Sequence, residues 1–220
     1  PADHVFALCF SGVRAEKTKE ALERYNLAAR RAREAAAACS RAWHADLPNL
    51  GAVLEHAETR HGRRAWLAIE RALAGTPRDL RLAGRVRQFV LEDRRYLPEA
   101  ERALCLRDLR RFGRMISLSH AASRRHLANI VPQVDFLQRS AIGLGALGAS
   151  GFGAGFGGAV LAVVSAERSD ELVRRWQRAY LASYPVESVE ARFFTAVPSD
   201  GIRFWNGEWS GRWVDRAFAE

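Results

Sequence analysis

The chain has 220 residues, 48% of them hydrophobic, and a formal net charge of +9. This length suffices for one large domain or two small ones with a substantial core, and the ordinary composition excludes a low-complexity or fibrous protein. The basic residues are nearly all arginines, which occur in short pairs along helical patterns and alternate with acidic residues. This dispersed charge is typical of solvated helix surfaces and argues against nucleic-acid binding.

Cysteine and histidine spacing limits the metal and disulfide chemistry of the chain. Cys9, Cys39 and Cys105 are far apart and odd in number, so we expect free thiols and a cytoplasmic location. His56 and His61 are five residues apart, whereas a zinc-hydrolase helix needs a spacing of four, so we expect surface or capping histidines and no metal site. The chain starts with proline and has no basic-then-apolar leader, which favours a processed or excised piece without a signal peptide.

In chain order, the first predicted element is a strand over 4–12, a short apolar run that ends at Ser-Gly. Helices are predicted over 63–75, over 80–97 and from the capping residue Asp108 onward, with a break at 45–51 after the first long helix. That first helix is indicated by an apolar stripe at steps of three and four residues, made of Leu22, Tyr25, Ala29, Ala32, Ala36, Cys39 and Trp43.

The second half of the chain alternates strands with one helix. Residues 159–165 and 189–197 have strand patterns, Ser169 is the expected cap of the helix between them, and 198–201 is a turn. The aromatic tail that follows is expected to be a hairpin or irregular. Together the elements predict one α+β domain over 1–220, a small sheet with helices packed on one face and a helical insertion after its first strand.

A glycine-rich window raises the question of function. Residues 140–166 carry no charge, and 145–160 alone contain seven glycines. The window is long enough to span a membrane, but each glycine costs a helix about 1 kcal/mol relative to alanine, which argues against a transmembrane helix. No G-K-[ST] is present, and a strand rather than a helix follows the glycines, so the phosphate-loop patterns do not fit. There remain a close-packed turn between strands and a backbone-exposing loop that approaches a ligand.

The segment "ASGFGAGFGGAVLAVV" (149–164) closely resembles the third signature of galactokinases, in the GHMP kinase superfamily. Gln88 stands where that family usually has histidine, and Ser150, Gly151 and Phe152 replace the common Arg-Met-Thr. Five other segments resemble galactokinase motifs in the same order, namely "CFSGVRAEKTKEALERYNLAARRAREAA" (9–36), "RVRQFVLEDRRYLPEAERAL" (85–104), "LRRFGRMISLSHAASRR" (109–125), "VPQVDFL" (131–137) and "VPSDGIRF" (197–204). The resemblance implies the α+β fold of a GHMP kinase C-terminal domain, in which the small sheet is antiparallel.

Three family signatures are missing from the chain: the galactose-reading G-E-H-x-D-Y loop, the nucleotide-binding P-x-x-x-G-L-S-S-S loop and the catalytic Asp segment. The sequence therefore resembles the C-terminal half of a galactokinase. For the intact protein the resemblance implies an ATP-dependent sugar 1-kinase that phosphorylates the anomeric hydroxyl of galactose or a related sugar. It implies ATP and Mg as cofactors, the N-terminal half of the same kinase as partner, and no activity for this chain alone.

The resemblance also assigns roles within the chain, none of them catalytic. Tyr25 is implied to border the sugar pocket, with simple packing in the apolar stripe as the alternative. Gly153, Gly155, Gly157 and Gly158 are implied to form a loop against the substrate cleft, with strand–turn packing as the alternative. For the chain as a whole, the alternative function is a stand-alone or catalytically inactive galactokinase-like module that binds a sugar or a partner.

Overall fold

A computed structural model describes residues 3–14, 19–77, 81–153 and 155–198. The predicted aromatic tail and most of the 198–201 turn lie outside these residues. In chain order the elements are β1 (His4–Phe10), α1 (Lys19–Trp43), α2 (Leu50–His61), η1 (Gly62–Arg64), α3 (Ala65–Leu73), α4 (Leu82–Leu91), the π-helical turn η3 (Glu92–Tyr96), α5 (Leu97–Cys105), α6 (Leu109–His126), α7 (Pro132–Gly143), β2 (Gly148–Phe152), β3 (Ala159–Ser165), α8 (Ala166–Ser183), η4 (Glu187–Val189) and β4 (Arg192–Ala196).

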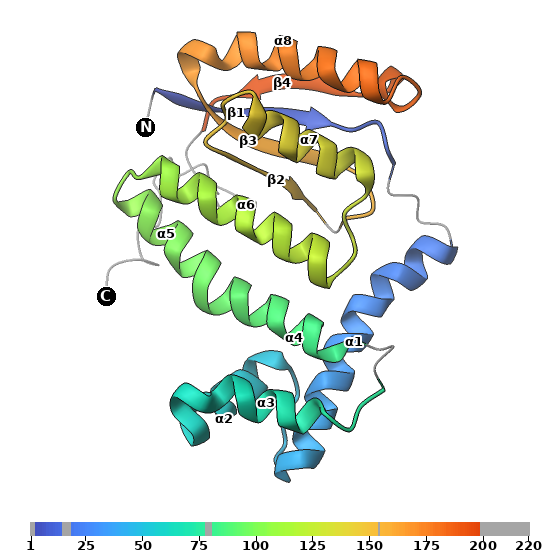
Figure 1. Cartoon of the computed structure of the whole chain (residues 1–220), viewed down its shortest axis with the longest axis vertical. Coiled ribbons are helices and arrows are strands. Elements are labelled where there is room, and N and C mark those ends of the chain that lie inside the picture. The colour runs from blue at the N-terminus through green and yellow to red at the C-terminus, as the bar shows by residue number, and fades with distance from the viewer. Residues whose placement is uncertain (1–2, 15–18, 78–80, 154, 199–220) are drawn as a thin grey trace, which may run out of the picture.

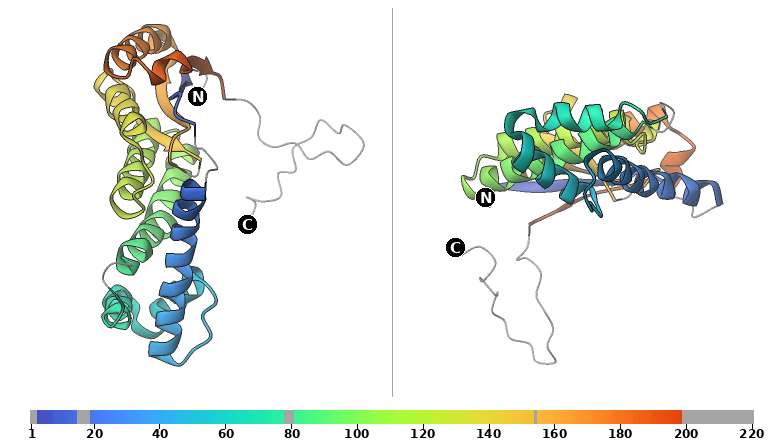
Figure 2. Two further views of the ribbon diagram at one scale, coloured as in Figure 1. Left: turned by 90° about the vertical axis from the view of Figure 1, so that its right-hand side faces the viewer. Right: turned by 90° about the horizontal axis from the view of Figure 1, so that it is seen from below.

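The four strands form one antiparallel sheet in the order β2-β3-β1-β4. Alternate residues of β1 point to one face, and the register pairs buried Ala7 with buried Ala162 of β3. Helices α7 and α8 cover this face, and the indole of Trp176 in α8 donates a 3.0 Å hydrogen bond to the carbonyl of Leu137 in α7. The predicted antiparallel sheet with helices on one face is confirmed (Figures 1 and 2).

The opposite face of the sheet is apolar but incompletely covered. Helix α6 runs along the outer edge of the sheet beside β2, where Gly113 and Gly148 meet backbone to backbone. On the opposite face Phe10, Phe152 and Phe194 are 47%, 48% and 41% exposed, and the rings of Phe10 and Phe194 stack with centroids 5.9 Å apart. We call these three phenylalanines the aromatic strip. Exposed aromatic side chains at neighbouring strand positions are typical of a surface that another segment covers.

A second core lies in a helical lobe made of the end of α1 with α2, η1, α3 and α4, at the opposite end of the molecule from the sheet (Figure 1). Cys39, Val53 and Ile69 are fully buried in it. The lobe confirms the predicted helical insertion, but α2 itself was not predicted. Its start is set by Asn49, whose side chain accepts a 3.0 Å hydrogen bond from the backbone N–H of Ala52.

Three further expectations need correction. The predicted 80–97 helix is α4, η3 and the start of α5, in one continuous path to Cys105. Helix α8 begins at Ala166, so Ser169 is not its cap; the Ser169 hydroxyl donates to the Ala166 carbonyl at 2.8 Å inside the first turn. Helix α7 and strand β2 were not predicted, and they occupy much of the glycine-rich window.

No helix among the described residues has both the length and the apolar character needed to cross a membrane.

All three cysteines are free, with Cys9 and Cys39 buried and Cys105 exposed. Burial raises the pKa of the Cys39 thiol to about 11. Cys39 therefore stays protonated near neutral pH and acts as a small core side chain.

Candidate functional site

The glycine loop, residues 153–158, connects β2 to β3 and packs beside the turn that follows β1. The backbone N–H and the hydroxyl of Ser11 both donate to the Gly158 carbonyl, at 2.9 and 2.7 Å. In return, the Gly158 N–H donates to the Val13 carbonyl at 3.0 Å. The S-G-V-R turn and the glycine loop, 140 residues and more apart in the sequence, therefore form one hydrogen-bonded unit.

Every described glycine of the loop has a backbone conformation that side chains disfavour. The φ angles of Gly153, Gly155, Gly157 and Gly158 are +94°, +90°, +135° and +90°. A Cβ on Gly157 would lie 2.6 Å from the Val13 carbonyl oxygen, and one on Gly155 would overlap Asn129. Among the described residues, a Cβ on Gly153 would meet no atom within 4 Å. Gly155 and Gly157 are thus required by close packing, whereas Gly153 presents open backbone.

His120 of α6 holds the end of β2, just before the glycine loop. Its side chain is buried, and its Nδ1 accepts a 3.1 Å hydrogen bond from the backbone N–H of Gly151 in β2. An accepting Nδ1 places the proton of the neutral ring on Nε2, which lies 3.7 Å from Oδ1 of Asp135 in α7. Burial lowers the pKa of His120, and the Arg124 charge lowers it further, although Asp135 opposes both. The neutral ring is therefore the form that holds the end of β2.

The polar residues around His120 form a connected network. The Asp135 carboxylate also pairs with Arg124 at 3.2 Å and with Arg139 at 3.1 Å. The neighbour of His120 on α6, Ser119, donates to the Glu92 carboxylate at 2.9 Å. These contacts fix α6 and α7 relative to β2, so the loop starts from a rigid frame.

A recess of about 50 Å³ lies between this network and the loop, with Ser123, Asn129, Gly153 and Gly155 among its lining residues. One water molecule takes up about 30 Å³ in the liquid, so the recess is too small to enclose a hexose. The described residues alone therefore do not form a complete sugar pocket. Tyr25 lies in α1, but its side chain is outside the described part of the chain, so its position relative to the loop remains a prediction.

Binding of ATP with magnesium would need metal ligands and free positive charges near the glycine loop. Across the described ranges, no three His, Cys, Asp or Glu side chains gather as metal ligands would. Arg14 of the turn after β1 is already paired with Glu190 at 3.0 Å, and Arg124 of α6 is already paired with Asp135 at 3.2 Å. The described residues of this site do not by themselves fit a magnesium nucleotide.

The sequence predicted the glycines of this site but not the side chains that hold them. His120, Asp135 and Ser119 have no role in the predicted site, although they lie in the quoted segments 109–125 and 131–137. A buried histidine next to serine on an amphipathic helix was the available signal. Its partner, the Gly151 N–H, could not be identified without β2.

Comparison with known proteins agrees with this fold. Residues 100–182 match the family described as GHMP kinases C terminal. The chain is 34% identical over 114 residues to a galactokinase of Mycobacterium tuberculosis (strain H37Rv), covering 52% of this chain and 31% of that protein. It is 29% identical over 114 residues to a galactokinase of Pyrococcus furiosus, covering 52% and 32%. A crystal structure of Lactococcus lactis galactokinase complexed with galactose matches the fold with a TM-score of 0.66 at 22% identity, covering 89% of this chain and 45% of that one.

Residues 100–182 are therefore similar to the C-terminal domain of GHMP kinases. The relatives that the chain matches by sequence are named galactokinases. The chain spans about a third of the length of those relatives and less than half of the Lactococcus lactis protein.

Proposed function

We propose that this chain is the C-terminal half of a cytoplasmic galactokinase-type kinase, which transfers the γ-phosphate of ATP to the anomeric hydroxyl of galactose or a related sugar. The observation that carries the proposal is the rigid glycine loop, in a domain whose sequence relatives are galactokinases. The N-terminal half of the same protein would supply the catalytic aspartate and the residues for ATP and magnesium. The sugar would lie in a cleft between the halves.

The aromatic strip supports a missing half on this side of the sheet. Phe10 is the last residue of β1 and Phe152 the last residue of β2, so both lie at the end of the sheet where the glycine loop begins. A chain segment that covered these rings would lie directly beside Gly153, whose backbone is open. Covering exposed aromatic surface is favourable at about 25 cal/mol per Å², so the strip offers a strong docking surface.

The residues of this chain would bind and position rather than react. Gly153 would let the sugar or a phosphate approach the backbone, while Gly155, Gly157 and Gly158 keep the loop in place against Asn129 and the turn after β1. Tyr25 would border the sugar, where a phenol can pack on a ring face and donate to a hydroxyl.

The test compares this chain with a protein extended upstream to the length of its relatives. A coupled assay with ATP and galactose should show turnover for the extended protein and none for the chain alone. Phe152→Asp should abolish turnover of the extended protein and leave the melting temperature of the chain alone unchanged, because Phe152 is half exposed. Leu181→Asp, at a similarly exposed position on α8, is the matched control and should change neither the turnover nor the melting temperature. Robust turnover by the chain alone would refute the proposal. Sugar binding without any turnover by the extended protein would favour the inactive-module alternative.

A further inference from the structure

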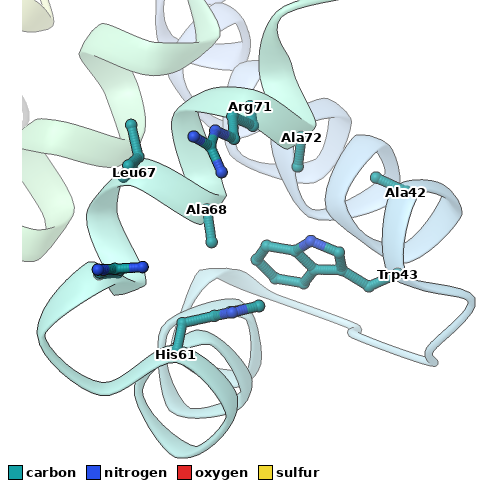
Figure 3. A pocket seen from close by; sticks show the side chains of 8 residues that line it. Ala42, Trp43, His61, Leu67, Ala68, Arg71 and Ala72 are labelled. Atoms are coloured by element: carbon teal, nitrogen blue, oxygen red, sulfur yellow. The ribbon is translucent and has the colours of Figure 1, made fainter.

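The helical lobe contains a pocket that has no part in the proposed kinase site. It has a volume of about 740 Å³ and lies between the end of α1, the end of α2 with η1, and α3. Figure 3 shows Trp43 and His61 pointing from α1 and α2 into the same space, under Ala68 and Arg71 of α3. The volume falls within the range of small-molecule sites in proteins.

The pocket has one flat aromatic wall, the indole of Trp43. Its position is fixed by two histidines of α2, since His56 stacks on the ring with centroids 5.2 Å apart and planes 12° apart, and His61 approaches at 6.0 Å. The expectation that these histidines are only surface or capping residues is thus incomplete. The remaining apolar lining includes the small side chains of Ala68 and Ala72, which leave space beside the indole for a second planar group.

The charged groups of the pocket are all positive. Arg64 and Arg71 lie seven residues apart at the start and near the end of α3, and both line the pocket. Within the described residues neither guanidinium has a carboxylate within 4 Å, whereas Arg94 pairs with Glu58 at 3.1 Å on the neighbouring helices. The described lining contains no carboxylate, amide or hydroxyl side chain. A cation would be repelled, and a neutral sugar would find few acceptors for its hydroxyl hydrogens.

We propose that this pocket binds a small aromatic anion, with a planar ring against Trp43 and a phosphate on Arg64 and Arg71. Guanidinium groups bind phosphate through paired, charge-assisted hydrogen bonds, and an indole offers a stacking face to a planar ring. The indole and the two guanidinium groups line the same pocket, and within the described chain no carboxylate neutralises either arginine. A nucleoside monophosphate has the required ring and charge at a suitable size.

The proposal is tested by calorimetric titration of the 220-residue chain with four probes: adenosine 5′-monophosphate, adenosine, ribose 5-phosphate and inorganic phosphate. The monophosphate should bind about tenfold or more tightly than either adenosine or ribose 5-phosphate, because only it supplies ring and charge together. Its affinity should fall at high ionic strength. Affinity for the three phosphates that is independent of the ring would mean adventitious anion binding and would overturn the proposal, as would no saturable binding of any probe.

Variants assign the binding to the pocket. Arg64→Gln and Arg71→Gln should each weaken monophosphate binding about tenfold, and both residues are exposed, so the fold should be kept. Arg102→Gln, an exposed and unpaired position on α5 within the described chain, is the matched control and should bind as the unmodified chain does. Trp43→Leu should reduce the preference for the nucleotide over ribose 5-phosphate, provided that its circular dichroism spectrum is unchanged. Unaltered binding by both arginine variants would place the ligand elsewhere and exclude this pocket.

Discussion

The hydroxyl of Tyr180 in α8 donates a buried hydrogen bond of 2.6 Å to the backbone carbonyl of Ser11, 169 residues away in the sequence. Ser11 in turn donates to Gly158 of the glycine loop. Ser11, the residue directly after β1, therefore connects helix α8 to the glycine loop of the candidate site. Burial raises the pKa of Tyr180 above its usual range, so the phenol is a protonated donor at any ordinary pH.

Replacing Tyr180 by phenylalanine should lower the free energy of unfolding by about 1–3 kcal/mol, because the buried Ser11 carbonyl loses its donor. For a chain of this length that corresponds to a melting temperature lower by about 2–4 °C per kcal/mol. Differential scanning calorimetry measures the change. Tyr184→Phe is the control, since Tyr184 stacks on Tyr180 at 5.3 Å but its hydroxyl has no partner within the described ranges. Equal effects of the two substitutions would show that the Tyr180 hydrogen bond contributes nothing specific.

Apolar patterning was sufficient to predict β1 and β3, which are short apolar runs, and α1, which has an apolar stripe at steps of three and four residues. It was insufficient for β2. Gly148 and Ala149 at its start show no apolar alternation, and this segment is a strand because its glycine lets α6 approach at Gly113. That approach is a tertiary contact, which no local pattern contains.

The candidate site was predictable only in part for a related reason. Its glycines stand together in the sequence, so the loop could be located. Its supporting side chains come from separate elements: His120 from α6, Asp135 from α7 and Ser11 from the turn after β1. Their convergence depends on the packing of α6 and α7 against β2, and the sequence had indicated neither β2 nor α7.

The loop glycines should differ in what they contribute. Gly157→Ala combines a left-handed conformation with a Cβ that would lie 2.6 Å from the Val13 carbonyl oxygen, so it should destabilise the isolated chain by more than the roughly 1–3 kcal/mol of backbone strain alone. Gly153→Ala carries the strain without the clash and should destabilise the chain less. Chemical denaturation of both variants measures the difference, which is the contribution of the loop–turn contact. A Gly157→Ala chain as stable as the unmodified one would contradict the observed packing.

In the extended kinase Gly153→Ala should impair substrate binding more than Gly157→Ala does, which is the reverse of their order for stability. The open backbone of Gly153 is the part of the loop that a ligand could approach, so Gly153→Ala should raise the Michaelis constant for sugar or ATP while the fold is retained. Steady-state kinetics of the extended protein, at a temperature well below the melting transition, makes this comparison. Normal Michaelis constants in Gly153→Ala would mean that the loop has only a packing role.

Tyr25 provides a test of the proposed sugar pocket. If its phenol donates to a sugar hydroxyl, Tyr25→Phe in the extended kinase should raise the Michaelis constant for the sugar by a factor of about 5–10, since one such bond is worth on the order of 1 kcal/mol. The Michaelis constant for ATP should change much less. Equal changes for both substrates, or no change, would indicate that Tyr25 only packs in the apolar stripe of α1.

The His120–Gly151 contact should make stability depend on pH. His120 accepts through Nδ1 only when neutral, and burial lowers its pKa in the folded chain below the unfolded value of about 6.5. The unfolded chain therefore binds the proton more readily, so the stabilisation is fully present above about pH 6.5. As the pH falls below that value the stabilisation is lost, at up to about 1.4 kcal/mol per pH unit until the folded-state pKa is reached. Denaturation curves of the unmodified chain and of His120→Gln, which keeps an acceptor but cannot titrate, isolate this effect from that of His126, whose pKa burial also lowers. The difference in unfolding free energy between the two proteins should shrink or change sign between neutral and acidic pH, and a difference that stays constant would show that His120 is not neutral in the fold.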